Sequence, residues 1–163
     1  MAKSISNPNI WNKIIKEFNK KKLKYILVGA AALTIHGLPR STLDIDIYIP
    51  AKGKTLDKLF KITNSLGLHS EQKSILNLIH SPALFANQWI CFSHRRQDIL
   101  DVFLSREKEF NKLYKHSKIK KDKTLSIRVA SLNDIKKMKK ESGRAIDLAD
   151  LKLIKEINKY RKK

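Results

Sequence analysis

The chain has 163 residues, which is enough for one domain with a sizeable core and too few for two comfortable ones. We therefore expect a single domain over residues 1–163. The hydrophobic fraction of 42% is ordinary for a folded protein, and no apolar run reaches the roughly 20 residues of a membrane span. The N-terminal residues lack the continuous apolar region of a signal peptide, which predicts a cytoplasmic protein with no membrane partner. Cys91 is the only cysteine, which excludes an internal disulfide and a cysteine-based zinc cluster.

The charge is strongly unbalanced: 35 Lys and Arg residues against 15 Asp and Glu residues give a formal net charge of +20. Such a field favours a polyanionic partner, with nucleic acid the first candidate and an anionic membrane surface the second. A lysine-rich composition can also reflect an AT-rich genome. The basic runs are not interleaved with aromatic residues, so the sequence alone indicates no base-stacking platform.

The spacing of apolar residues predicts alternating helices and strands in the first half of the chain. We expect helices over 9–21, 30–37 and 55–66, and strands over 24–28 and 43–49. The segment 68–84 is ambiguous, because "SILNLI" is compatible with either a strand or a turn of helix.

The second half of the chain predicts a β-hairpin followed by a helical C-terminus. "WICFSH" and "DILDVFLS" are typical of two strands, joined by a turn around Arg95, Arg96 and Gln97. A charged helix over 106–114, a basic loop and the strand "TLSIRVA" follow. Ser131 and Asp134 resemble a capping box, and "AIDLADLKLIKEINKY" predicts a long final helix. The order predicts an α/β (α+β) fold, a mixed β-sheet with helices packed on it, made of a sheet core (1–130) and a C-terminal helical segment (131–163).

Two aspartates one residue apart are the clearest chemical signal. Side chains alternate along a strand, so Asp44 and Asp46 share one face while Leu43, Ile45 and Ile47 hold the strand to the core from the other. Carboxylates so placed suit a hard cation such as Mg²⁺. The alternative is an edge strand whose aspartates only serve solubility.

A third carboxylate lies in the apolar strand "ILDVFL". We favour Asp101 over Asp98, because Asp98 adjoins the polar turn. If the two strands are neighbours, three carboxylates converge, and such a set can hold two Mg²⁺ ions for phosphoryl chemistry. A strand that ends at Gly29 and opens into a helix also indicates phosphate binding by backbone N–H groups.

The stretch "VGAAALTIHGLPRSTLDIDIYI" resembles the signature of the minimal nucleotidyltransferases of the polymerase β-like superfamily. Its "HG-x-x-R-x-T-x-D-x-D" pattern is similar to the AbiEii-type toxins and a related bacterial branch. In that branch a later strand supplies a third carboxylate, matched by Asp101. The C-terminal "MKKESGRAIDLADL" matches a further pattern with Lys139, Arg144, Asp147 and Asp150.

The resemblance implies the nucleotidyltransferase (polymerase β-like) fold and a set of site residues. Catalysis and metal binding fall to Asp44, Asp46 and Asp101, and nucleotide binding to Gly29, Ala30, Arg40, Ser41, Thr42, Lys139 and Arg144. The family usually has Gly-Gly or Gly-Ser where this chain has Gly29-Ala30. The backbone N–H groups there can still donate hydrogen bonds to a phosphate, and Ser41 and Thr42 are the candidates to supply hydroxyls. Asp147 and Asp150 either orient the basic residues or cap the last helix, and His36 is either structural or functional.

The implied activity is transfer of a nucleoside monophosphate from an NTP, ATP among them, to an acceptor hydroxyl, with two Mg²⁺ ions and release of pyrophosphate. The charge points to RNA as acceptor, for example a tRNA end, and the toxin-like pattern to a toxin–antitoxin pair with an antitoxin protein as partner. A protein or antibiotic hydroxyl is the alternative acceptor. A catalytically silent fold that binds RNA or protein is the alternative of another class.

Overall fold

The structure is a computed structural model that describes residues 8–71, 88–122 and 124–162. The ambiguous "SILNLI" segment lies outside the described residues. Within them, no helix is both long enough and apolar enough to cross a membrane.

The described residues form six helices and six strands, largely where the sequence predicts them. The helices are α1 (Pro8–Lys20), α2 (Gly29–Ile35), α3 (Gly53–Ser65), α4 (Glu107–His116), α5 (Leu132–Ser142) and α6 (Ala145–Arg161). The strands are β1 (Ile26–Val28), β2 (Ile45–Pro50), β3 (Trp89–His94), β4 (Gln97–Ser105), β5 (Lys118–Asp122) and β6 (Leu125–Val129). The predicted hairpin is confirmed as β3 and β4, and the predicted Ser131 cap accepts a hydrogen bond from the backbone N–H of Asp134.

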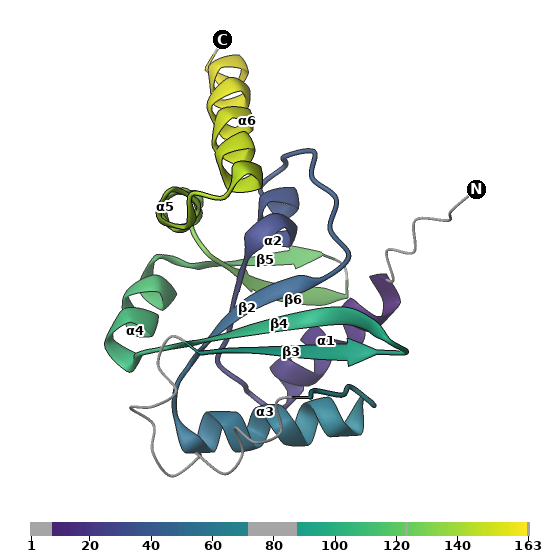
Figure 1. The fold of residues 1–163 in the computed structure, drawn as a ribbon. Coiled ribbons are helices and arrows are strands. Elements are labelled where there is room, and N and C mark those ends of the chain that lie inside the picture. The colour runs from purple at the N-terminus through teal and green to yellow at the C-terminus, as the bar shows by residue number, and fades with distance from the viewer. Residues whose placement is uncertain (1–7, 72–87, 123, 163) are drawn as a thin grey trace, which may run out of the picture.

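All six strands belong to one mixed sheet with the order β3-β4-β2-β1-β6-β5 (Figure 1). The strand β2 runs parallel to β4 and antiparallel to β1, and β1 runs parallel to β6. The pairing of β2 with β4 joins segments more than 50 positions apart in the chain. This arrangement confirms the mixed sheet that the element order predicts.

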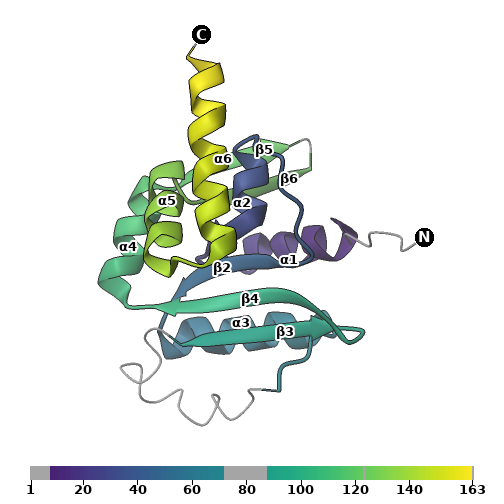
Figure 2. The same cartoon turned by 45° about the horizontal axis from the view of Figure 1, so that its top comes forward.

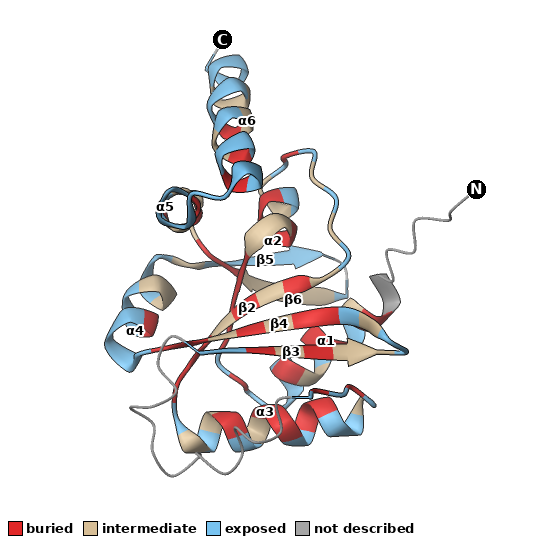
Figure 3. Cartoon of the chain, in the orientation of Figure 1, coloured by how far each residue is buried: buried red, intermediate tan, exposed pale blue. Residues whose placement is uncertain are grey.

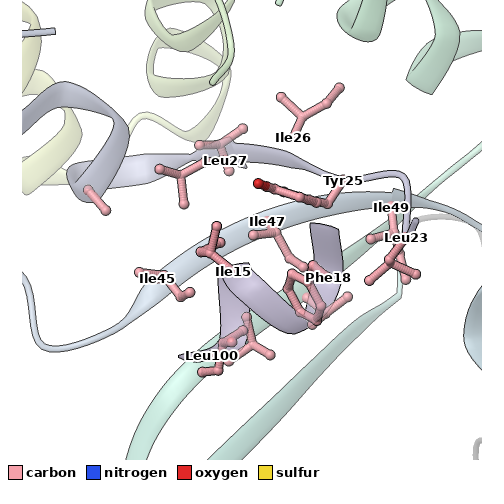
Figure 4. Close-up of a cluster of buried hydrophobic side chains, with 14 of the residues drawn as sticks. Ile15, Phe18, Leu23, Tyr25, Ile26, Leu27, Ile45, Ile47, Ile49 and Leu100 are labelled. Carbon is pink, nitrogen blue, oxygen red and sulfur yellow. The ribbon is translucent and has the colours of Figure 1, made fainter. Parts of the chain in front are cut away.

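One face of the sheet is the hydrophobic core, covered by α1 and α3. Ile15 and Phe18 of α1 pack toward Leu27, Ile47 and other apolar side chains of the central strands (Figure 4). Burying each such side chain stabilises the fold by about 1.5–3 kcal/mol. The expectation that Leu43 belongs to this core is wrong: β2 begins only at Ile45, and Leu43 is 56% exposed in the loop before it.

The opposite face of the sheet lies toward α5 and α6, which stand on the other side from α1 and α3 (Figures 1 and 2). Because side chains alternate along a strand, Asp46 and Tyr48 of β2 share this face with Asp101 and Phe103 of β4. The core residues on the first face therefore fix the register that sets polar and aromatic side chains side by side on the second.

The strand β5 is the one described element that the sequence analysis expected to be a loop. All five of its residues are exposed, and no apolar alternation marks it (Figure 3). It is held in place by antiparallel pairing with β6, from Lys118 opposite Val129 to Asp122 opposite Leu125. Its lysines suit a sheet edge, because charge there opposes pairing with another chain.

Candidate active site

The register of the central strands brings three carboxylates together. Asp46 of β2 pairs directly with Asp101 of β4, and Asp44 lies in the turn just before β2. Each of the three residues offers a carboxylate oxygen within 4.8 Å of the others. The predicted convergence of Asp44, Asp46 and Asp101 is thus confirmed, and we call these three residues the carboxylate triad.

The electrostatics of the triad are those of acids held close together. Burial raises the pKa of Asp46 to about 7, and the charges of Asp44 and Asp101 contribute to the rise, against the opposing effect of Lys139 and Arg144. Burial also raises the pKa of Asp101, with contributions from nearby carboxylates, while hydrogen bonds from Cys91 and Trp89 lower it. Three anions in so small a space are unfavourable unless protons or cations compensate them.

The triad also passes a direct test of fit to a hard cation. The Oδ1 atom of Asp101 is buried and has no hydrogen-bond partner among the described residues. Buried carboxylate oxygens rarely lack a partner, because leaving one unsatisfied costs about 1–3 kcal/mol. Oxygen ligands from carboxylates are also those that Mg²⁺ prefers. The residues present therefore fit a divalent metal site.

Gly29 leaves space for the carboxylate of Asp46, which packs directly against its backbone. Its φ is +70°, and a Cβ atom added there would lie 2.1 Å from Oδ2 of Asp46. Both the backbone conformation and the close approach therefore require glycine. Ala30 follows in the first turn of α2, a helix of only seven residues.

Thr42 orients the first carboxylate of the triad. Its hydroxyl donates to Oδ1 of Asp44 at 2.7 Å, and the backbone N–H of Asp44 points back to the same hydroxyl at 3.4 Å. This contact fixes Asp44 although the residue stands outside β2. Thr42 therefore positions a triad carboxylate by hydrogen bonding. No hydrogen bond joins the neighbouring Ser41 to the triad among the described residues.

A buried ion cluster joins α5 to α6 beside the triad. Lys139 is only 7% exposed, and its Nζ lies 3.0 Å from Oδ1 of Asp147 and 2.7 Å from Oδ2 of Asp150. Burial raises the pKa of Asp147, but hydrogen bonds from Ser142, Arg144 and Lys139 outweigh it and lower the pKa to about 2. Asp147 and Asp150 therefore position basic residues, one of the two roles the sequence left open.

The two arginines of the predicted site lie in different places. Arg144 bonds to Oδ2 of Asp147 through Nε at 2.8 Å, yet its side chain is 73% exposed. Arg40 has its Nε 2.9 Å from Oδ1 of Asp150, an ion pair without hydrogen-bond alignment. Arg40 is therefore tied to α6, whereas Arg144 keeps most of its guanidinium in solvent.

A cavity of about 400 Å³ opens beside the triad. It is lined by Gly29, Asp46, Lys139 and Arg144, together with an aromatic pair and the apolar side chains Ile135 and Met138 of α5. A separate cavity of about 460 Å³ between α1, α2 and the loop before β2 is lined by Arg40, Ser41 and Thr42. Of the predicted nucleotide-binding residues, three therefore line the first cavity, three line the second, and Ala30 lines neither. Of these two cavities, only the first is lined by a triad carboxylate.

The aromatic pair of the first cavity was missed from the sequence. Tyr48 and Phe103 stack with ring centroids 5.4 Å apart and planes inclined by 23°. They follow Asp46 and Asp101 by two residues on paired strands. The period-two alternation that linked Asp44 to Asp46 could have found both, had it been continued along each strand.

His36 has a structural role in the described chain. Its Nε2 lies 2.8 Å from the carbonyl oxygen of Ala130, which ties the end of α2 to the end of β6. The carbonyl oxygen of His36 accepts a hydrogen bond from Arg161 at the end of α6. Both contacts join distant segments, in keeping with the structural alternative.

Comparisons with known proteins concern the fold and the family of this chain. A protein of Thermotoga maritima with a provisional nucleotidyltransferase assignment is similar over 93% of this chain and 92% of its own, with a TM-score of 0.61 and 15% identity. An H. pylori protein with the same provisional assignment shares 14% identity over 85% of this chain and 58% of its own, with a TM-score of 0.46. The first likeness shows the nucleotidyltransferase fold. No curated protein sequence matches the chain. The model of one protein family matches residues 10–159, and the chain therefore belongs to the family described as nucleotidyltransferase of unknown function (DUF6036).

Proposed function

We propose that this protein is a metal-dependent nucleotidyltransferase that transfers a nucleoside monophosphate from an NTP to an acceptor hydroxyl. The observation that carries the proposal is the carboxylate triad, whose oxygens lie within 4.8 Å of one another. Membership of the nucleotidyltransferase family supports the same class of reaction.

The triad carboxylates are the residues that would hold Mg²⁺. When bound, a pair of such ions lowers the pKa of an attacking hydroxyl and neutralises charge on the phosphates. Asp46 is central, because it pairs with Asp101 and packs on Gly29. Thr42 holds Asp44 in place through its hydroxyl.

The 400 Å³ cavity is the proposed place of the NTP. Arg144 supplies the exposed guanidinium, which suits bidentate contact with phosphate oxygens. Lys139 is already committed to two carboxylates, so it is a positioning residue that fixes α6 and, through Asp147, the guanidinium of Arg144. The stacked Tyr48 and Phe103 offer a ring face against which a nucleobase can stack.

The chemical step then balances as an in-line displacement. The acceptor oxygen forms a bond to the α-phosphorus while the bond from the α-phosphorus to the bridging oxygen breaks. Pyrophosphate leaves with the bonding electrons, and the hydroxyl proton passes to Asp101. The protein contributes no nucleophile, so its residues act by positioning and by charge. The toxin role and an antitoxin partner rest on the AbiEii-like pattern alone and stay predictions.

Label transfer tests the proposal. The protein is incubated with Mg²⁺, each α-labelled NTP in turn, and total RNA or cell lysate as the source of acceptors. We expect transfer by the wild type that EDTA and Asp101→Asn abolish, and that the matched control Asp98→Asn, an exposed acid three residues earlier, retains. Absence of transfer to every acceptor class, or full activity of Asp101→Asn, would contradict the proposal.

A further inference from the structure

We infer that the β3–β4 hairpin binds the single-stranded end of a nucleic acid acceptor and presents its terminal hydroxyl to Asp101. The inference rests on the proposed function and names its acceptor class. It is carried by Trp89, Arg95 and Arg96, which lie outside the motif that identifies the triad.

The position of the hairpin follows from the geometry of an in-line displacement. The attacking and leaving oxygens must lie on opposite sides of the α-phosphorus. The cavity with Lys139 and Arg144 lies on the Asp46 side of the triad, toward α5. The opposite side is Asp101 on β4, and beyond it the described residues add only β3 and a single β-bridge between Ser93 and His69. The acceptor must therefore approach Asp101 over β3.

Trp89 gives this approach a stacking surface. It pairs directly with Phe103 across the hairpin, and Phe103 pairs with Tyr48, so three aromatic residues form one row across β3, β4 and β2. Trp89 lies two residues before Cys91, which pairs with Asp101 across the hairpin, and Trp89 is 44% exposed. Aromatic side chains that stack with bases strengthen single-strand binding by roughly tenfold or more per base. Trp89 therefore places a stacking surface directly beside the carboxylate that faces the acceptor.

The hairpin turn adds two cations in an unusual backbone conformation. Arg95 and Arg96 have φ values of 50° and 65°, whereas tight hairpin turns of this kind favour Asn-Gly or other residues that tolerate positive φ. Non-glycine residues in that conformation are strained, and such strain gathers at functional sites. Both side chains are exposed, and within the described parts of the chain neither has a carboxylate at ion-pair distance.

The aromatic ring of Trp89 together with the two arginines of the turn favours a nucleic acid over the other acceptors. A protein or antibiotic hydroxyl would need no pair of guanidinium groups about 17 Å along the strand from Asp101, which is five residues from Arg96 at a rise of about 3.4 Å per residue. A single strand uses both the stacking surface and the pair of cations, because its bases stack on the ring and its phosphates continue along the chain away from the reacting end. The net charge of +20 attracts the same partner from a distance.

Binding of labelled single-stranded RNA, measured by fluorescence anisotropy in EDTA across a range of salt concentrations, tests the inference without turnover. The variant Arg95→Asn with Arg96→Gly gives the turn its preferred residues, so its fold is preserved while two charges are removed. The matched control Lys120→Gln with Lys121→Gln removes two exposed charges from β5, at the opposite edge of the sheet. Trp89→Ala and Trp89→Phe separate loss of stacking from retention of an aromatic ring.

We expect the arginine variant to weaken RNA binding at least tenfold and to reduce the slope of log affinity against log salt by about 1.4, the value for two phosphate contacts of a single strand. The lysine control should bind within about twofold of the wild type. Trp89→Ala should weaken binding about tenfold, and Trp89→Phe less. Equal losses in the arginine variant and the lysine control, or no loss in either, would overturn the inference.

The failure of this inference is distinguishable from failure of the proposed function. Label transfer to RNA with a KM that the arginine variant leaves unchanged would overturn the role of the hairpin while the proposed function stands. Transfer only to a protein or small-molecule hydroxyl would do the same. Absence of metal-dependent transfer from any NTP would instead overturn the proposed function.

Discussion

Replacing Asp46 by asparagine should stabilise the metal-free protein while it destroys the metal site. Asp46 has its pKa raised from 3.8 to about 7, first by burial and then by the charges of Asp44 and Asp101. In the unfolded chain the carboxyl titrates near its ordinary value. The folded state therefore binds more protons between pH 4 and pH 7, and its stability falls as the pH rises through that window. The asparagine side chain of the variant does not titrate and escapes this loss.

The magnitude follows from the size of the shift. About three pKa units, at 1.36 kcal/mol each, correspond to about 4 kcal/mol at pH 8. The three carboxylates share their protons, which spreads the cost over the whole triad, so we expect about 2 kcal/mol from Asp46→Asn alone. The gain should vanish near pH 4, where the wild-type carboxyl is protonated in the folded state.

Urea unfolding in EDTA at pH 4.5 and pH 8 measures this effect. The control is Asp57→Asn, which makes the same chemical change at an exposed acid of α3 paired with Lys61. Mg²⁺ at 100 times its Kd should stabilise the wild type by about 2.7 kcal/mol and leave the Asp46→Asn variant unchanged. A variant that is no more stable than the wild type at pH 8, or one that Mg²⁺ stabilises equally, would refute the reasoning.

Three further predictions concern the surroundings of the triad. Gly29→Ala should lose at least about 2 kcal/mol more in thermal unfolding than Gly67→Ala, because both have positive φ but only the first adds a Cβ 2.1 Å from a triad oxygen. Equal losses would show that the close approach carries no cost. Lys139→Met should destabilise the protein by about 3–5 kcal/mol, because it leaves two buried carboxylates without their shared cation. Lys140 is exposed, so the control Lys140→Met should change the stability by under about 0.5 kcal/mol. Asp147 has its pKa lowered to about 2. The stability advantage of the wild type over Asp147→Asn should therefore shrink by about 2 kcal/mol as the pH falls from about 4 to about 2. A difference in urea midpoints that stays constant over this pH range would contradict the prediction.

The triad and most of the fold could be predicted because their signals are local. The alternation of Asp44, Ile45, Asp46 and Ile47 predicts the strand and the face of Asp46, although Asp44 itself lies just before β2 and is held by Thr42. Asp101 stood out because it interrupts an apolar strand. That β2 and β4 lie side by side was still an assumption, because strand order depends on packing between segments that are far apart in the sequence.

The features that escaped prediction depend on long-range contacts. The strand β5 has no apolar alternation of its own and exists through its pairing with β6. Arg40 is part of the nucleotidyltransferase-like motif and was expected to bind the nucleotide. Its ion-pair partner is Asp150, which lies 110 positions later in the chain. The row of Trp89, Phe103 and Tyr48 likewise comes from three strands, so no run of sequence displays it.

The most direct test of the account is the number of Mn²⁺ ions that the protein binds in the presence of a non-hydrolysable NTP analogue, measured by electron paramagnetic resonance. We expect about two ions per chain for the wild type, as two-metal nucleotidyl transfer requires, and loss of both metal and analogue binding in Asp46→Asn. Asp98→Asn should match the wild type. An absence of bound Mn²⁺ in the wild type, or unchanged binding in Asp46→Asn, would contradict the claim that the carboxylate triad is a metal centre.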